Sequence, residues 1–78
     1  MISQLFHRSL PEAAKTRVLS VLRQRAEHGE AGLSNADIRQ ITRLDRYQVV
    51  RLMKELQRED LAVVREGVGK GSRYRYRG

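Results

Sequence analysis

A chain of 78 residues has room for one domain with one small core, which buries only about 60% of the surface that an unfolded chain exposes. The net charge is +7 and is uneven, because residues 1–33 carry five basic and three acidic residues whereas residues 34–78 carry eleven and six, and this favours a polyanionic partner. The absence of cysteine excludes disulfides and thiolate metal sites, and the absence of a signal-peptide core or a long apolar run predicts a soluble, cytoplasmic protein with no membrane partner.

The first predicted helix follows Ser9-Leu10-Pro11-Glu12, which combines a capping box with an early proline. Apolar residues then recur at helical spacing as far as His28-Gly29 and predict a helix of about four turns. These residues are Val18, Leu19, Val21, Leu22 and Ala26.

Two further helix starts are marked by capping boxes. Ser34-Asn35-Ala36-Asp37 predicts a short second helix, flanked by Leu33 and Ile38 as a hydrophobic staple. Asp45-Arg46-Tyr47-Gln48 is a D-x-x-Q variant of the same box and predicts a third helix. Only Thr42, Arg43 and Leu44 separate these helices, so we expect them to cross steeply, which is typical of a helix-turn-helix.

A β-hairpin is predicted at the C-terminal end. From Leu61 the hydrophobic period changes from about 3.6 to about 2, and the glycines at 67, 69 and 71 permit a tight reversal. The returning strand, 72–77, alternates arginine with tyrosine. Because alternate side chains point to opposite faces, we expect Tyr74 and Tyr76 to cover the helix core while Arg73, Arg75 and Arg77 face solvent.

The sequence gives little support for nucleotide binding, metal binding or catalysis. The stretch 67–71 contains Gly-Lys but lacks the spacing of a nucleotide-binding loop. His7 and His28 have no further ligands at metal spacing, and no serine has an arranged base. We therefore expect no catalytic activity, no cofactor, no metal and no small-molecule substrate. The acidic pair Glu59-Asp60 falls at a helix end where the helix dipole disfavours it.

The order helix, short strand, helix, helix, hairpin resembles the winged-helix family over residues 10–77. The tail from Arg65 to Arg75 is similar to the G-x-G-[KR]-G-[ST]-x-Y ending of winged-helix modules at the C-terminus of RecG-like helicase-related proteins and of transcriptional regulators with an AlbA or Schlafen-type domain. The resemblance implies an α+β winged helix-turn-helix with three helices, three strands and a hairpin wing. It also implies that the chain is the C-terminal domain of a larger protein, with residues 1–9 as a linker and residues 10–78 as the winged-helix domain.

The resemblance further implies that the third helix enters the major groove of double-stranded DNA while the wing lies beside it. The recognition positions would then be Arg46, Tyr47, Gln48, Val50, Arg51 and Lys54, and the wing contacts would be Lys70, Arg73 and Arg75. The prediction of DNA binding depends on one face being shared by Arg46, Arg51, Lys54, Arg73 and Arg75. Asp60 stands where the family usually has glycine, and we expect it to adopt the left-handed conformation of a helix exit.

A second function remains open, namely a protein-docking or homodimerisation module. Val50 lies at an exposed position that is commonly polar in the family it resembles. We therefore expect Val50 to contact either a thymine methyl group or a protein. Leu5 and Phe6 add apolar residues near the N-terminus. Either function depends on a core whose predicted members are Val18, Leu22, Ile38, Ile41, Val49, Met53, Leu56 and Val63.

Overall fold

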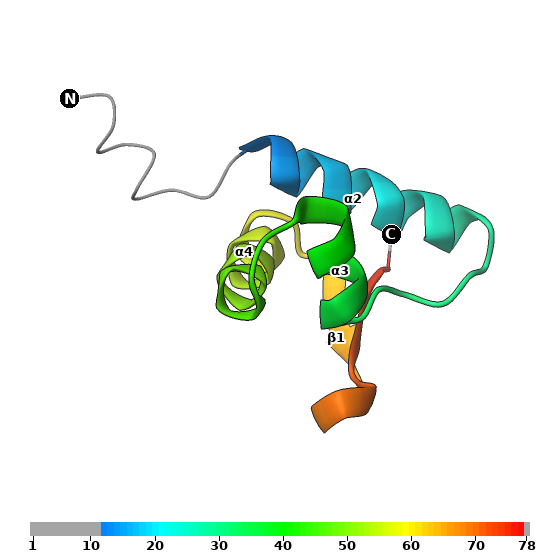
Figure 1. The fold of residues 1–78 in the computed structure, drawn as a ribbon. Coiled ribbons are helices and arrows are strands. Elements are labelled where there is room, and N and C mark those ends of the chain that lie inside the picture. Colours follow the sequence, from blue (N-terminus) through cyan, green and yellow to red (C-terminus); the bar gives the residue numbers. More distant parts are fainter. Residues whose placement is uncertain (1–11, 78) are drawn as a thin grey trace.

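The computed structural model describes residues 12–77, which form three helices and a C-terminal hairpin (Figure 1). The elements in chain order are α2 (Glu12–Glu27), α3 (Asn35–Thr42), α4 (Arg46–Glu59), β1 (Val63–Glu66), the short 3₁₀ turn η1 (Gly69–Gly71) and β2 (Arg73–Tyr76). This α+β layout confirms the predicted class and is compatible with a winged helix. The predicted linker, and residues 9–11 of the first capping box, lie outside the described residues.

Both internal helix starts are confirmed. Ser34 Oγ accepts a hydrogen bond from the Asp37 N–H at 3.1 Å, and the Ser34 N–H donates to Asp37 Oδ2 at 3.0 Å. At the start of α4, Asp45 Oδ1 accepts from the Gln48 N–H at 2.8 Å, and the Asp45 N–H donates to Gln48 Oε1 at 2.9 Å. Each box gives a side-chain acceptor to two backbone N–H groups, one on the N-cap residue and one three residues later. These hydrogen bonds determine where the two helices begin.

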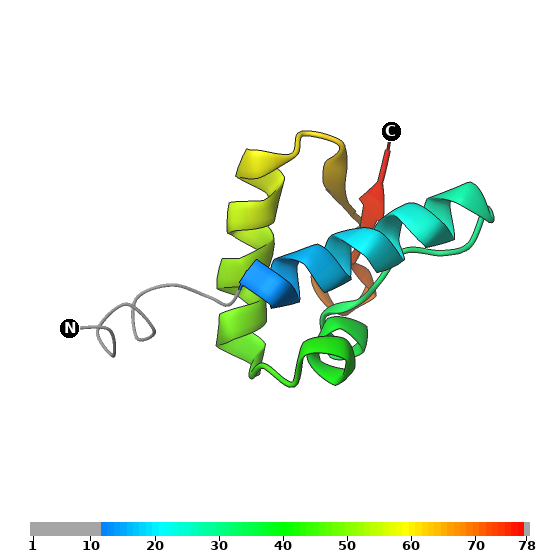
Figure 2. The ribbon, with the colours of Figure 1, turned by 90° about the horizontal axis from the view of Figure 1, so that it is seen from above.

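The turn between α3 and α4 is as short as predicted. Arg43 is in the left-handed conformation, with φ 63°, and its N–H donates to the Arg39 carbonyl at 2.8 Å. Thr42 Oγ1 donates to the Ile38 carbonyl and accepts from the Leu44 N–H. As a result α3 and α4 cross steeply, and α2 lies across α4 (Figure 2).

Ten buried apolar side chains form one core between the helices and the inner face of the hairpin: Val18, Leu22, Leu33, Ile38, Val49, Leu52, Met53, Leu56, Val63 and Tyr74. Seven of the eight predicted core members are among them. The eighth, Ile41, is half-buried at the edge of the core. Ala26, predicted on the apolar face of the first helix, is exposed because α2 extends past the core at its C-terminal end.

The hairpin pairs β1 and β2 antiparallel, from Val63 opposite Tyr76 to Glu66 opposite Arg73. The first strand starts at Val63, two residues later than predicted, and Leu61 is 85% exposed. The reason is a turn directly after α4, in which the Ala62 N–H donates to Asp60 Oδ1 and the Val63 N–H to the Asp60 carbonyl. Asp60 is extended, with φ −138°, so its predicted left-handed conformation is wrong.

In place of the third strand predicted between the first two helices, the structure has an isolated bridge at Leu33. The Leu33 N–H donates to the Tyr74 carbonyl and the Tyr74 N–H donates to the Leu33 carbonyl, both at 2.8 Å. A Cβ atom on Gly32 would stand 2.0 Å from the Tyr74 carbonyl oxygen, so this close approach requires glycine. The bridge fastens the hairpin to the segment that leads into α3.

Candidate nucleic-acid interface

A groove of about 680 Å³ runs between the N-terminal half of α3, one face of α4 and the tip of the hairpin. Five basic side chains line it, and no carboxylate is among its lining residues. The basic residues are Arg39, Arg46, Lys54, Arg65 and Lys70. We call this surface the basic groove.

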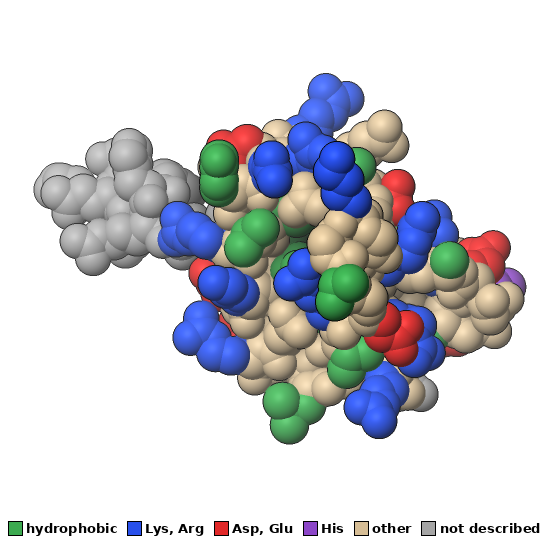
Figure 3. Space-filling view, turned by 90° about the horizontal axis from the view of Figure 1, so that it is seen from below, with side chains coloured by type: hydrophobic (Ala, Val, Ile, Leu, Met, Phe, Trp, Pro, Cys, Tyr) green, Lys and Arg blue, Asp and Glu red, His purple; other side chains and the backbone are tan. Residues whose placement is uncertain are grey.

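The basic groove lies on the side of the molecule from which the hairpin tip projects. Seen from that side, Lys and Arg side chains gather over α4 and the hairpin around the hollowed surface (Figure 3). Asp and Glu side chains are sparse on this part of the face (Figure 3). Val50, Tyr74 and Gln57 supply apolar and amide surface between the charges. A concave, cationic and partly apolar surface is suited to a segment of polyanionic backbone.

The predicted residues of α4 divide into two sets. Arg46, Val50 and Lys54 recur at intervals of four and line the basic groove from one face of the helix. Tyr47 and Arg51 are exposed on the adjoining face and are not among the lining residues. Tyr47 is the most exposed aromatic side chain of residues 12–77, at 76%.

Gln48 is occupied by the capping box. Its Oε1 accepts the Asp45 N–H at 2.9 Å, which holds the side chain at the start of α4. A bidentate contact to adenine needs both the oxygen and the NH₂ of the amide. The capping bond uses one of the two lone pairs of Oε1, so it restricts the orientation in which Gln48 can contact a base.

Arg73 and Arg75 are the two predicted wing contacts that the structure directs away from the groove. The alternation that turns Tyr74 into the core turns both arginines to the opposite face of β2. Neither lines the basic groove, and neither does Arg51, so the expectation that Arg46, Arg51, Lys54, Arg73 and Arg75 share one face is met only by Arg46 and Lys54. Lys70 is the one predicted wing contact that lines the groove with them.

Both arginines are also paired with carboxylates. Arg75 donates twice to Glu66, at 3.0 Å and 2.6 Å, and these bonds lower the pKa of Glu66 below its ordinary value. Arg73 Nη1 donates to the Gly32 carbonyl at 3.1 Å and lies 3.5 Å from Asp37 Oδ2. The hydrogen bond from the Ser34 N–H is the main reason that the pKa of Asp37 is lowered, and Arg73 contributes. These pairs tie the two strands together and tie the hairpin to α3.

Sequence reasoning did not identify several groove residues, above all Arg39, Arg65, Asn35 and Gln57. Two signals were available. Asn35 and Arg39 are four residues apart on a helix and therefore share a face. Arg65 is two residues from the buried Val63 on the same strand, so it points to the helix side of the hairpin, beyond the core.

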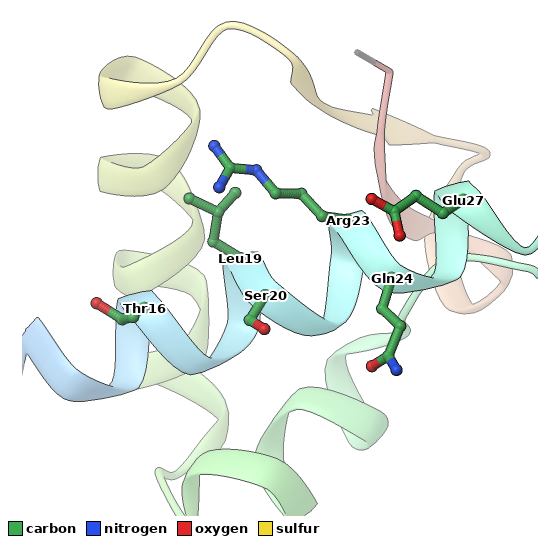
Figure 4. A pocket seen from close by; sticks show the side chains of 6 residues that line it. All are labelled: Thr16, Leu19, Ser20, Arg23, Gln24 and Glu27. Atoms are coloured by element: carbon green, nitrogen blue, oxygen red, sulfur yellow. The ribbon is translucent and has the colours of Figure 1, made fainter.

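Other surfaces of residues 12–77 carry less chemistry. A shallow depression of about 490 Å³ follows the outer side of α2 between Thr16 and Glu27 (Figure 4). At its hairpin end, the Arg23 guanidinium lies 5.2 Å from the centre of the Tyr76 ring, a cation–π contact. Within the same residues, no His, Cys, Asp and Glu cluster is arranged to hold a metal ion, and no helix is long and apolar enough to span a bilayer.

Comparisons with protein-family models, with curated proteins and with solved structures found no match to this chain.

Proposed function

We propose that the domain is a winged helix that binds double-stranded DNA. In this proposal α4 enters the major groove and the hairpin is the wing. The isolated Leu33–Tyr74 bridge takes the place of the third strand. The observation that carries the proposal is the basic groove, where five cationic side chains from α3, α4 and the hairpin converge without a carboxylate in the lining. Phosphate contacts of this kind supply most of the non-specific affinity for DNA.

The roles proposed for the groove residues differ in part from those expected from the sequence. Lys54, Lys70 and Arg65 would meet phosphates, because each is on a different element and together they span the groove. Arg46 and Val50, on the first half of α4, would approach base edges, where arginine pairs with guanine and valine contacts a thymine methyl group. The domain would act by binding alone, within a larger cytoplasmic helicase-related protein or transcriptional regulator.

The test is a salt titration of binding to a fluorescent random-sequence duplex, measured by anisotropy, for the parent protein and for the double variant Lys54→Ala/Lys70→Ala. Each phosphate contact contributes about −0.9 to the slope of log K against log salt concentration. We therefore expect the double variant to flatten the slope by nearly two units. Arg17→Ala is the matched control, because Arg17 is exposed on α2 beside Ile41 and Leu44, away from the groove. It should leave the slope unchanged.

The alternative is a docking or dimerisation module, and exposed apolar residues on α4 favour it. Tyr47 is 76% and Val50 37% exposed. If duplex DNA does not bind at low salt, or if the double variant and Arg17→Ala behave alike, the DNA proposal is overturned. Sedimentation of the free protein would then show whether Tyr47 and Val50 mediate self-association, since Tyr47→Ala would return a dimer to a monomer.

A further inference from the structure

We propose that Ser72 and Arg65 together form a binding site for one phosphate of the DNA backbone, on the hairpin side of the basic groove. This inference rests on the proposed DNA binding and adds Ser72, a neutral residue, to the groups that hold the backbone. Sequence reasoning assigned the wing contacts to basic residues alone, and neither Ser72 nor Arg65 was among them.

The two side chains lie on the same face of the hairpin. Arg65 is opposite Tyr74 in the register of the strands, and Ser72 is two residues before Tyr74, so all three point to the helix side. Tyr74 enters the core, whereas Arg65 and Ser72 lie nearer the tip and line the basic groove. Arg65 Nη2 donates to Ser72 Oγ at 3.1 Å. The hairpin thus presents a guanidinium and a hydroxyl side by side to the groove.

The turn before Ser72 fixes the position of its backbone. The Ser72 N–H donates to the Gly69 carbonyl at 3.2 Å, and the backbone of Ser72 is extended. Gly67 packs against it with φ 86°, and a Cβ at Gly67 would stand 3.2 Å from Ser72 Cα and 3.0 Å from the Gly71 carbonyl oxygen. Position 67 therefore requires glycine, and the turn that it permits determines where the hydroxyl lies.

Arg65 is oriented by the protein but its charge is not compensated. Its hydrogen-bond partner is a neutral hydroxyl, whereas the other four basic side chains of the groove have no partner within residues 12–77. The neighbouring carboxylate, Glu66, points to the opposite face of β1, where it accepts two hydrogen bonds from Arg75. A guanidinium that is held in place and retains its full charge is prepared to bind an anion.

Both groups have hydrogen-bond donors left for a ligand. A guanidinium carries five N–H donors, and the bond to Ser72 uses one of those of Arg65. The Ser72 hydroxyl accepts that bond and makes no other side-chain hydrogen bond in the described part of the chain, so its own proton remains to be donated. The oxygens of a phosphodiester accept hydrogen bonds from both groups, and guanidinium–phosphate bonds are among the stronger ones in proteins.

The experiment separates the hydroxyl from the charge. Salt titrations on the fluorescent random-sequence duplex compare the parent protein with Ser72→Ala, Ser72→Thr, Arg65→Ala and the double variant Arg65→Ala/Ser72→Ala. Ser20→Ala is the matched control, because Ser20 is an exposed serine on the outer side of α2. Melting curves show whether each variant is folded.

We expect Ser72→Ala to weaken binding about three- to tenfold at every salt concentration without changing the slope, because a neutral hydroxyl displaces no counterion. Ser72→Thr keeps the hydroxyl and should bind within about twofold of the parent protein. Arg65→Ala should flatten the slope by about 0.9. In the double variant the two losses should be less than additive, since both residues act on one phosphate.

A carboxylate at position 72 provides an independent test. In Ser72→Asp the new side chain would accept the hydrogen bond from Arg65 and neutralise the guanidinium in place of the phosphate. We therefore expect the slope to flatten by about 0.9, as in Arg65→Ala. Ser20→Asp adds the same charge outside the groove and should leave the slope unchanged.

The outcomes distinguish this inference from the proposed function. If the parent protein binds no duplex DNA, or if Lys54→Ala/Lys70→Ala leaves the slope unchanged, the proposed function fails and the inference fails with it. If that double variant flattens the slope but Ser72→Ala and Ser72→Asp behave like the same changes at Ser20, the phosphate site is refuted while DNA binding stands. Full additivity of Ser72→Ala and Arg65→Ala would also overturn the site, because the two residues would then contact separate groups.

Discussion

At the scale of single residues, Lys15 is the one buried charged side chain of residues 12–77. It is buried, yet its Nζ lies 2.8 Å from Glu59 Oε2, 2.9 Å from Glu55 Oε1 and 3.4 Å from Glu12 Oε2. The hydrogen bonds that the Lys15 ammonium donates to Glu59 and Glu55 raise the pKa of Lys15 above its ordinary value. Glu59, which the helix dipole disfavours at the end of α4, is thereby explained as a partner of α2.

Replacing this lysine should destabilise the domain. Lys15→Met keeps most of the side-chain volume but removes the ammonium group that pairs with both Glu55 and Glu59. We expect a loss of about 1–3 kcal/mol in the free energy of unfolding at pH 7, less than for a fully buried pair because Glu59 is 55% exposed. Urea unfolding of both proteins measures it. Adding Glu55→Gln to Lys15→Met should recover part of the loss, and if it does not, the cluster contributes by packing alone.

The same cluster predicts a pH dependence. The hydrogen bond from Lys15 is the main reason that the pKa of Glu55 lies below its ordinary value of 4.5. A carboxylate with a lowered pKa contributes stability above about pH 4.5 that is lost as the pH falls through the folded-state pKa. The difference in stability between the parent protein and Lys15→Met should therefore shrink below about pH 4.5. A difference that stays constant down to pH 3 would contradict this account.

At the scale of elements, local patterns determined what sequence reasoning predicted correctly. Each capping box lies within four consecutive residues, and the alternation in β2 directs Tyr74 inward and Arg73 and Arg75 outward. Contacts between distant segments were not predictable in this way. The Lys15–Glu59 bond joins residues 44 positions apart, and Arg73 meets the Gly32 carbonyl across 41 positions. No periodic pattern encodes such a partner.

We expect the hairpin to contact phosphates through its tip. Lys70→Ala should make the salt slope less negative by about 0.9, because Lys70 lines the basic groove. Arg73→Ala/Arg75→Ala removes two charges but should change the slope by less than one unit, since Asp37 and Glu66 already neutralise them. Salt titrations of the two proteins make the comparison. A change near two units for the double variant would show that both ion pairs open and the arginines reach phosphate.

The attachment of the hairpin to the helices depends on Gly32. In Gly32→Ala the new Cβ would stand 2.0 Å from the Tyr74 carbonyl oxygen, so the Leu33–Tyr74 bridge must open. We expect a loss of about 2 kcal/mol or more in stability and faster hydrogen exchange at the Leu33 and Tyr74 amides. Gly71→Ala is the control, because a Cβ there meets nothing within 4 Å. Unchanged exchange in Gly32→Ala would mean that the hairpin is held by its side chains alone.

At the scale of the whole molecule, the basic groove could not be predicted because it exists only once three elements are assembled. Arg39 on α3, Lys54 on α4 and Arg65 on β1 lie in separate parts of the sequence, and none stands in a basic run that marks it as functional. Their convergence depends on the steep crossing of α3 and α4 and on the Leu33–Tyr74 bridge. Binding should therefore be lost together with the core and not element by element.

Leu56 tests this coupling. It is 3% exposed and belongs to the ten-residue core, so Leu56→Ala should cost about 2–5 kcal/mol, a large part of the roughly 4–12 kcal/mol expected for a domain of this length. Leu61→Ala removes the same atoms from a side chain that is 85% exposed and should change stability by no more than about 0.5 kcal/mol. Thermal melting of both proteins gives the comparison.

Duplex DNA then shows whether the groove and the core form one cooperative unit. A ligand that binds only the folded state stabilises it by about 2.7 kcal/mol at a concentration of 100 Kd. Duplex at that concentration should thus raise the Tm of Leu56→Ala and restore a single cooperative transition, while a non-binding polymer such as neutral dextran should not. If Leu56→Ala melts within a few degrees of the parent protein, the buried face of α4 is misplaced. If it unfolds but still binds DNA with the parent's salt slope, binding does not require the assembled groove.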